Sequence, residues 1–261
     1  MFIEQRKSLI VEELTANGSV SLNDLTDKLG VSQATIRRDL TELERSGLLK
    51  RTHGGAVPAE LAAFEAGYAD KENVNLEEKR SIARVCSSMV NDGDTVMLDS
   101  GTTTFEIARA IRTKKITIIT NSATIISDFI NYGHAPAELV CIGGIFRPNF
   151  RCFVGSETEN FIRKIIPDKV FIAANGFSVT HGASTPMLVE ASVKRAMLGA
   201  GKHIFLAIDS SKMGNDYLSV IAPPEDFDGI ITDRKLSRRM YNQLINRGLT
   251  VYTENTKLFE E

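Results

Sequence analysis

The 261-residue sequence has few cysteines, no long hydrophobic run and no excess of positive charge. Cys86, Cys141 and Cys152 are widely spaced, which argues against a disulfide framework or a zinc site, so we interpret them as packing residues. We expect no metal and no cofactor. No apolar stretch approaches the roughly 20 residues that a membrane-spanning helix needs, and the first residues are charged where a signal peptide is apolar. These features predict a cytoplasmic protein without a membrane partner.

The overall charge is nearly balanced, with 31 Lys and Arg against 33 Asp and Glu and a formal net charge of −2. Domains that bind nucleic acids are often basic, so this total argues weakly against such a partner. Residues 1–57 are balanced as well, but Arg37, Arg38, Lys50 and Arg51 fall in two short segments. The placement of these side chains therefore matters more for DNA binding than the total charge.

The first 57 residues have the hydrophobic spacing of three helices followed by a hairpin. Residues 2–16 repeat apolar side chains on one face. A second, short helix ends at Gly30, and a third is capped by Ser32 and ends at Gly47. A hairpin is predicted around Gly54-Gly55. Two helices joined by a tight turn, with a hairpin behind them, predict a winged helix-turn-helix in residues 1–57.

In this arrangement the third helix is the recognition helix. Gln33 can pair with adenine, Thr35 can contact a thymine methyl group or a phosphate, and the arginine pair that follows can bind guanine or the DNA backbone. Basic residues of the hairpin can contact phosphates or the minor groove. The alternative is a helical packing module whose arginines are merely solvated. The expected DNA-binding residues are Ser32, Gln33, Thr35, Arg37, Arg38, Lys50, Arg51 and His53.

The segment VSQATIRRDLTELERSGLLKRTHGGAV resembles the DNA-binding domain of the DeoR-type transcriptional regulators. The resemblance covers roughly residues 5–57 and implies that the arginine pair lies on the recognition helix and that THGGA lies in the wing. It favours the DNA-binding interpretation over the packing module. We therefore expect double-stranded operator DNA as a partner. We also expect a homo-oligomer, a dimer or tetramer, because one recognition helix reads too few base pairs for specificity.

Residues 58–75 are rich in alanine and charged residues and are predicted to link the two domains. From residue 76 to 261, helices alternate with short apolar segments, which predicts a mostly parallel α/β sheet covered by helices on both faces. One of these helices is expected after Thr104. The predicted strands are TVMLD, ITIIT, ELVCIGG, KVFIAA, HIFLAID, GIITD and TVY.

Ligands of such sheets bind at the carboxyl ends of the strands. The first strand is followed by the loop DSGTTT and a helix N-terminus, where free N–H groups and hydroxyls suit a phosphate. Taken singly, each motif has a plain alternative: the loop is an ordinary βα turn, and Glu190 with Lys194 is a surface pair one helical turn apart. The expected effector-binding residues are Asp99, Ser100, Gly101, Thr102, Thr103, Thr104, Asn121, Gly144, Arg147, Asn175, Glu190, Lys194 and Lys212.

The motifs DSGTT, TNS, the GG pair before Arg147 and DSSK resemble the sensor domain of DeoR-type proteins, which is similar to ribose-5-phosphate isomerase in fold and phosphate loop. The resemblance implies that residues 100–104 hold a phosphate, that Asp99, Lys194 and Lys212 surround the sugar, and that Glu190 completes the pocket. The family commonly has G-A-D-G where this chain has Ala-Ala-Asn175-Gly. An amide cannot act as a general acid or base, which weakens a catalytic interpretation.

We therefore expect a repressor of a carbohydrate-utilisation operon that a phosphorylated sugar releases from its operator, although an activator remains an alternative. A second alternative is a sugar-phosphate isomerase-like enzyme with a DNA-binding appendage. Such an enzyme needs a base beside the substrate carbon, for which Glu190 and Asp99 are the candidates. A third is an oligomeric scaffold that binds no ligand. We expect no catalytic residue and no enzyme, and pentose, hexose, ketose and sugar-alcohol phosphates all suit the predicted site.

Overall fold

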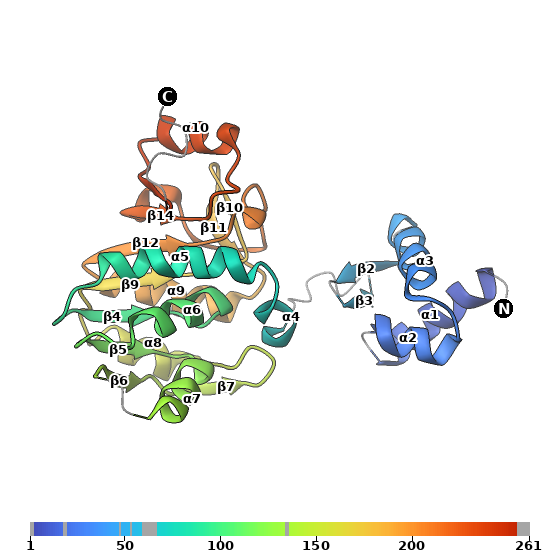
Figure 1. Ribbon diagram of the computed structural model, residues 1–261, viewed down its shortest axis with the longest axis horizontal. Helices are drawn as coiled ribbons and strands as arrows, with labels where there is room; N and C mark the ends of the chain where they lie inside the picture. Colours follow the sequence, from blue (N-terminus) through green and yellow to red (C-terminus); the bar gives the residue numbers. More distant parts are fainter. Residues whose placement is uncertain are drawn as a thin grey trace. The chain divides into compact units, whose positions relative to one another are not determined.

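The chain divides into two compact units, Met1–Asp70 and Lys71–Glu261, both drawn in Figure 1. Each unit has its own hydrophobic core. The expected linker, residues 58–75, spans this division, and residues 59–66 of it lie outside the described residues. The computed structural model describes residues 3–17, 20–46, 48–52, 54–58, 67–133 and 136–254.

The N-terminal unit is a winged helix-turn-helix, as the sequence predicts. Its elements are α1 (Ile3–Asn17), β1 (Val20–Ser21), α2 (Leu22–Leu29), α3 (Gln33–Arg45), β2 (Leu49–Thr52) and β3 (Gly55–Pro58). Ser21 and Ser32 cap α2 and α3, because their hydroxyls accept the backbone N–H groups three residues later at 3.0 and 3.2 Å. Gly30 ends α2 at φ 65°, in the left-handed conformation that favours glycine.

Three antiparallel strands in the order β1-β3-β2 form the wing and join it to the helices. Gly55 permits this contact, because a Cβ there would lie only 1.7 Å from the carbonyl oxygen of Val20. Apolar side chains from all three helices and the sheet pack together. They include Ile10, Leu14, Leu25, Ile36, Leu40, Leu43 and Leu49.

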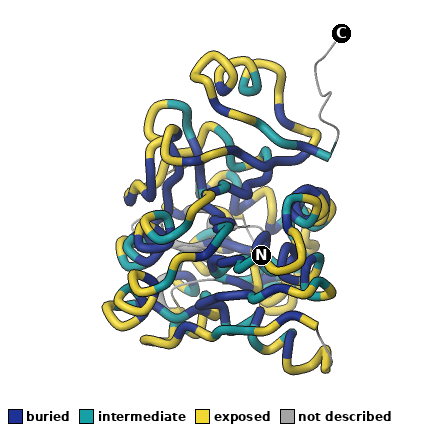
Figure 2. Tube along the Cα trace, turned by 90° about the vertical axis from the view of Figure 1, so that its left-hand side faces the viewer, coloured by how far each residue is buried: buried dark blue, intermediate teal, exposed yellow. Residues whose placement is uncertain are grey.

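The larger unit is built on a seven-stranded parallel sheet in the order β15-β14-β12-β9-β4-β5-β6. In β4, β5 and β9 every residue after the first is buried, and buried stretches of the trace are dark blue in Figure 2. Such continuous burial is typical of a parallel sheet with both faces covered. The strands are β4 (Thr95–Leu98), β5 (Thr117–Thr120), β6 (Glu138–Cys141), β9 (Lys169–Ile172), β12 (His203–Ala207), β14 (Gly229–Ile231) and β15 (Val251–Tyr252).

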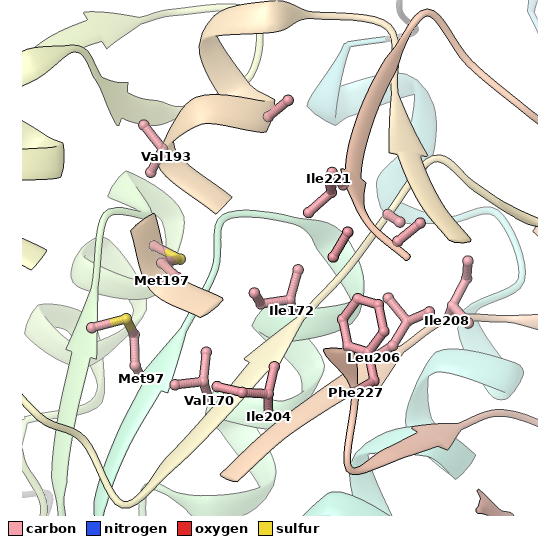
Figure 3. Close-up of a cluster of buried hydrophobic side chains, with 14 of the residues drawn as sticks. Met97, Val170, Ile172, Val193, Met197, Ile204, Leu206, Ile208, Ile221 and Phe227 are labelled. Carbon is pink, nitrogen blue, oxygen red and sulfur yellow. The ribbon is translucent and has the colours of Figure 1, made fainter. Parts of the chain in front are cut away.

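Helices cover both faces of this sheet and divide the core in two. Side chains of α5, α6 and α7 pack on one face. Side chains of α8, α9 and α10 pack on the other, where Met97 and Val170 from the strands lie with Val193 and Met197 from α9 (Figure 3). The helices of this unit are α5 (Leu76–Met89), α6 (Thr102–Ile111), α7 (Ala123–Tyr132), α8 (Ser156–Ile162), α9 (Leu188–Ala200) and α10 (Arg238–Asn246), with short 3₁₀ turns η2 (Ser210–Lys212) and η3 (Pro224–Asp226). The short helix α4 (Tyr68–Glu72) spans the division between the two units.

Two small antiparallel sheets add to this framework, and the sequence does not predict either. One is the hairpin of β7 (Ile145–Arg147) and β8 (Cys152–Val154). The other pairs β10 (Gly176–Ser178) with β11 (Gly182–Thr185) and β11 with β13 (Ser219–Ala222). The start of α6 is also corrected, because the helix begins at Thr102 and includes the threonines that we expect to precede it. No helix in the described part of the chain is long and apolar enough to cross a bilayer.

Candidate functional site

The recognition helix α3 has one buried face and one exposed face. On the buried side, Asp39 accepts two hydrogen bonds from the guanidinium of Arg6 on α1, at 2.5 and 3.0 Å. This hydrogen bond with Asp39 raises the pKa of Arg6. The pair is buried and fixes α3 against α1. Arg37 and Arg38 lie on the exposed face, so the helix presents both arginines outward, as expected for DNA contact.

The expected contacts at the start of α3 are organised by hydrogen bonds within the unit. The side-chain amide of Gln33 donates to Asn23 Oδ1 of α2 at 2.9 Å. The hydroxyls of Ser32 and Thr35 lie 2.9 Å apart. Both bonds are exposed to solvent, and they link the start of α3 to α2 and to its own N-cap residue.

The wing is tied to the recognition helix through Arg51. Its backbone N–H donates to Glu44 Oε1 at 2.9 Å, and its guanidinium donates to Thr41 Oγ1 at 2.8 Å. In this structure Arg51 is thus a positioning contact within the unit, although its side chain is exposed. His53 and the side chain of Lys50, the other two expected wing contacts, lie outside the described residues.

A buried ion pair lies at the carboxyl edge of the sheet in the larger unit. Asp99, directly after β4, is 1% exposed and pairs with Lys194 of α9. Asp99 also accepts the N–H of Ala173 at 3.1 Å, and Lys194 donates to the carbonyl of the same residue at 3.0 Å. The ends of β4 and β9 and the helix α9 therefore meet at this pair. Lys194 is not the surface residue of the plain alternative, and neither is Glu190, which is also buried.

The helix α6 begins at Thr102, three residues after Asp99 of this pair. Thr102, Thr103 and Thr104 are buried in its first turn, and no side chain caps the helix at Gly101. Within the described residues, Thr103 Oγ1 is buried and has no hydrogen-bond partner. Thr104 Oγ1 donates to the carbonyl of Gly101 at 3.1 Å, and Ser100 Oγ lies 3.4 Å from Asp99 Oδ1. An uncapped helix start with an unpartnered hydroxyl suits an anion.

The β7–β8 hairpin brings a second charged pair to the edge. Arg147 Nη1 lies 3.3 Å from Glu190 Oε1 of α9. Gly144 precedes the hairpin at φ 150°, where a Cβ would lie 2.0 Å from Thr158 Oγ1. Asn121, after β5, donates to the carbonyl of Phe153 in β8 at 2.8 Å. Its Oδ1 is buried and, among the described residues, has no hydrogen-bond partner.

Two expected residues lie on other parts of the edge. The amide oxygen of Asn175 accepts the hydroxyl of Thr185 at 3.0 Å, which ties it to β11. Lys212 of η2 lies 3.5 Å from Asp209 Oδ2. Burial lowers the pKa of Lys212, and the nearby carboxylate of Asp209 opposes this shift.

Three residues of this edge are missed by the sequence interpretation. Cys152 of β8 lies close to Ser100 and Glu190. Burial of the thiol, together with the charge of Glu190, raises the pKa of Cys152 to about 12. Asn75 donates to Asp209, and Lys79 is a buried lysine of α5. Burial, with the charge of Lys212, lowers the pKa of Lys79 to about 8. No sequence signal marks them, because each acquires its role from segments far away in the chain.

The comparison with solved structures finds matches of low similarity. Ribose 5-phosphate isomerase A from Methanocaldococcus jannaschii is 15% identical with a TM-score of 0.39, and the match covers 53% of this chain and 55% of that chain. For eIF2B delta from Chaetomium thermophilum the identity is 15%, the TM-score 0.43, and the coverage 61% and 57%. The match thus spans little more than half of either protein, and similarity at this level does not identify a ligand.

The sequence comparisons are far more specific. Residues 6–60 match the family model of the DeoR-like helix-turn-helix domain, and residues 74–234 match that of the DeoR C-terminal sensor domain. The transcriptional regulator GlpR of Haloferax volcanii is 36% identical, with 96% of this chain and 98% of that protein covered. The transcriptional repressor AccR of Agrobacterium fabrum is 36% identical, covering 88% and 89%. The lactose phosphotransferase system repressor of Staphylococcus epidermidis is 33% identical, covering 86% and 89%.

These relatives are named as regulators or repressors, and the matched domains are a DNA-binding domain and a sensor domain. The alternative of an isomerase-like enzyme with a DNA-binding appendage is therefore set aside. The chain belongs to the DeoR family of transcriptional regulators.

Proposed function

We propose that this regulator represses a carbohydrate-utilisation operon and that a phosphorylated sugar releases it from operator DNA. The observation that carries the sugar-phosphate part is the buried, unpartnered hydroxyl of Thr103 in the uncapped first turn of α6, beside the Asp99–Lys194 pair. The name of one relative, a repressor of the lactose phosphotransferase system, supports a sugar-related operon.

Operator contact is assigned to the exposed side of α3 and to the wing. Arg37 and Arg38 would bind phosphates or guanine, and Gln33 would reach a base edge from the position in which Asn23 now holds it. Because one recognition helix reads few base pairs, a dimer or tetramer would bind a symmetric operator. A protein with this task acts in the cytoplasm. The complete proposed contact set is Ser32, Gln33, Thr35, Arg37, Arg38, Lys50, Arg51 and His53.

The effector would bind along the carboxyl edge of the sheet. A phosphate dianion at the start of α6 would accept hydrogen bonds from the free N–H groups of residues 102–104 and from the hydroxyl of Thr103. Sugar hydroxyls would donate to Asp99 and Glu190 and accept from Lys194 or Arg147. Lys212 and the side chains of Ser100, Asn121 and Asn175 would complete the polar surroundings.

A ligand screen followed by an operator-binding assay tests this proposal. We would measure the melting temperature with ribose 5-phosphate, glucose 6-phosphate, fructose 6-phosphate and sorbitol 6-phosphate, which represent an aldopentose, an aldohexose, a ketohexose and a sugar alcohol. A stabilising compound is expected to weaken operator binding in a gel-shift assay by about 5- to 150-fold, the usual range of coupling between two sites. The unphosphorylated sugars are the controls. Stabilising compounds that leave operator affinity unchanged would contradict the proposal.

A further inference from the structure

Residues Lys71–Asn75, which we call the output segment, connect the end of α4 to the start of α5. On one side the segment contacts the turn of the β7–β8 hairpin. The ammonium of Lys71 lies over the ring of Phe150, 5.9 Å from its centroid, and Glu72 Oε2 lies 3.7 Å from Arg151 Nη1. Arg151 adopts φ 52°, a backbone conformation that non-glycine residues rarely take, so the shape of this turn is tightly constrained.

The same aromatic ring also contacts the proposed effector site. The guanidinium of Arg147 lies over Phe150, 4.5 Å from the ring centroid, while Arg147 Nη1 lies 3.3 Å from Glu190 Oε1. One ring therefore contacts a cation of the effector site and a cation of the output segment. Both contacts depend on the position of the ring, since cation–π attraction falls off beyond about 6 Å.

On its other side the output segment contacts the loop after β12. The side-chain amide of Asn75 donates to Asp209 Oδ1 at 3.1 Å and to Ser211 Oγ at 3.0 Å. Asn75 is the residue before α5 and has φ 52°, but its side chain does not cap that helix. Asp209 in turn lies 3.5 Å from Lys212, another cation of the proposed site.

Lys79 of α5 holds the first residue of the segment. Lys79 is 2% exposed, and its ammonium donates to the carbonyl of Lys71 at 2.5 Å. Burial and the nearby charge of Lys212 disfavour the protonated form of Lys79, while Asp209 favours it. The hydrogen bond to Lys71 thus shares its electrostatic surroundings with the Asp209–Lys212 pair.

We propose that the output segment reports occupancy of the effector site, with Phe150 as the positioning residue that couples Arg147 to Lys71. This inference rests on the proposed function and adds a route by which binding is transmitted. An anion that draws Arg147 from Glu190, or Lys212 from Asp209, alters the contacts on both sides of the segment. In the sequence, residues 59–70 join this segment to β3 of the wing, so the segment is the part of the sensor unit next to the DNA-binding unit along the chain.

The first experiment needs no ligand. Hydrogen exchange followed by mass spectrometry on the full chain would compare wild type with Arg147→Ala and Phe150→Leu. The N–H of Val74 donates to the carbonyl of Lys71 at 3.2 Å, so it reports on the segment. We expect both substitutions to accelerate exchange in residues 71–75 by about fivefold, the lower end of typical coupling. Exchange at the wild-type rate in both variants would overturn the coupling.

A matched control lies in the same hairpin. The ring of Phe146 packs on Phe153, 5.3 Å between centroids, so Phe146→Leu also removes one ring contact of the hairpin but leaves Phe150 in place. It is expected to leave exchange in the output segment at the wild-type rate. Acceleration as large as that in Phe150→Leu would mean that general loosening of the hairpin is responsible, which would also overturn the proposal.

The second experiment measures effector response with the stabilising sugar phosphate from the screen. Phe150→Leu is expected to bind this compound and the free operator within about threefold of wild type, but the ratio of operator affinities without and with it should fall to about twofold or less. A wild-type ratio would overturn the inference. If the screen yields no compound, the proposed function fails, and the exchange experiment still decides whether Arg147 and the output segment are coupled.

Discussion

The hydroxyl of Thr103 is buried at the start of α6 and, in the described part of the chain, lacks a hydrogen-bond partner. Burying such a group without a partner costs roughly 1–3 kcal/mol. This unpartnered hydroxyl lies at the start of a helix, next to a buried ion pair. A ligand bound there would supply the missing hydrogen bond, and the complex would regain the free energy that the ligand-free state loses.

Replacing Thr103 with valine keeps the shape of the side chain and removes the hydroxyl. We expect Thr103→Val to leave the free energy of unfolding unchanged or raise it by about 1 kcal/mol. It should weaken effector binding by about 10- to 150-fold, since a hydrogen bond to a charged group contributes about 1.5–3 kcal/mol. Thermal denaturation and calorimetry measure the two effects.

Thr232 offers a matched control, because its hydroxyl is also buried without a partner among the described residues. Thr232→Val should change stability in the same direction and leave effector affinity unaltered. Equal loss of affinity in both variants would argue against phosphate binding at α6.

At the scale of single elements, the buried face of α3 is fixed by contacts within its unit, and the opposite face is exposed to solvent. Arg6 fixes Asp39 on the buried face, whereas Arg38, the residue before it, is exposed. Arg38→Ala should therefore weaken operator binding by about 5- to 150-fold, as for loss of a base or phosphate contact worth about 1–3 kcal/mol, with little change in melting temperature. Arg45→Ala, at the other end of the same helix, is the control. Wild-type operator affinity in Arg38→Ala would show that α3 is misassigned.

The end of the described chain is attached to α5 by one carboxylate. Glu254 accepts hydrogen bonds from Arg84 at 2.6 Å and from Ser81 at 2.8 Å, and these bonds, with the charge of Arg84, lower the pKa of Glu254 to about 2. Because the pKa is lower in the folded state, the stabilisation is present above the unfolded value, about 4.5, and is lost as the pH falls towards 2.

Glu254→Gln should consequently flatten the loss of stability between pH 4.5 and 2. The difference is expected to stay below about 1 kcal/mol, because solvent screens this partly exposed ion pair. Urea denaturation across that pH range measures it. A variant with the acid sensitivity of wild type would mean that Glu254 does not contribute to this titration.

At the scale of the whole molecule, net charge and DNA binding have to be reconciled. The chain carries a formal net charge of −2, so attraction to DNA must come from local patches of basic side chains rather than from the total. The logarithm of operator affinity should fall linearly with the logarithm of salt concentration, and Arg38→Ala should reduce the slope by about one if Arg38 binds a phosphate. An unchanged slope combined with relaxed sequence preference would instead indicate a base contact.

The parts of the fold that sequence predicts are those with local signals. Ser21, Ser32 and Gly30 mark helix ends in the DNA-binding unit, and continuous apolar runs mark the strands of the parallel sheet. The strand Gly182–Thr185 has small residues and no alternation, so its sheet is not predicted. At the carboxyl edge of the sheet, the sequence marks the motif residues that follow the strands. It does not mark Cys152, Asn75 and Lys79, because only tertiary packing brings them to this edge.

The separate cores of the two units also imply a response to heat. The DNA-binding unit buries a small apolar cluster, and small domains bury a smaller share of their surface and are less stable than large ones. Warming would then melt the operator-binding unit before the sensor, and calorimetry of the full chain should show two transitions. If the protein acts as the repressor proposed above, a temperature upshift would lower its occupancy of the operator without any effector.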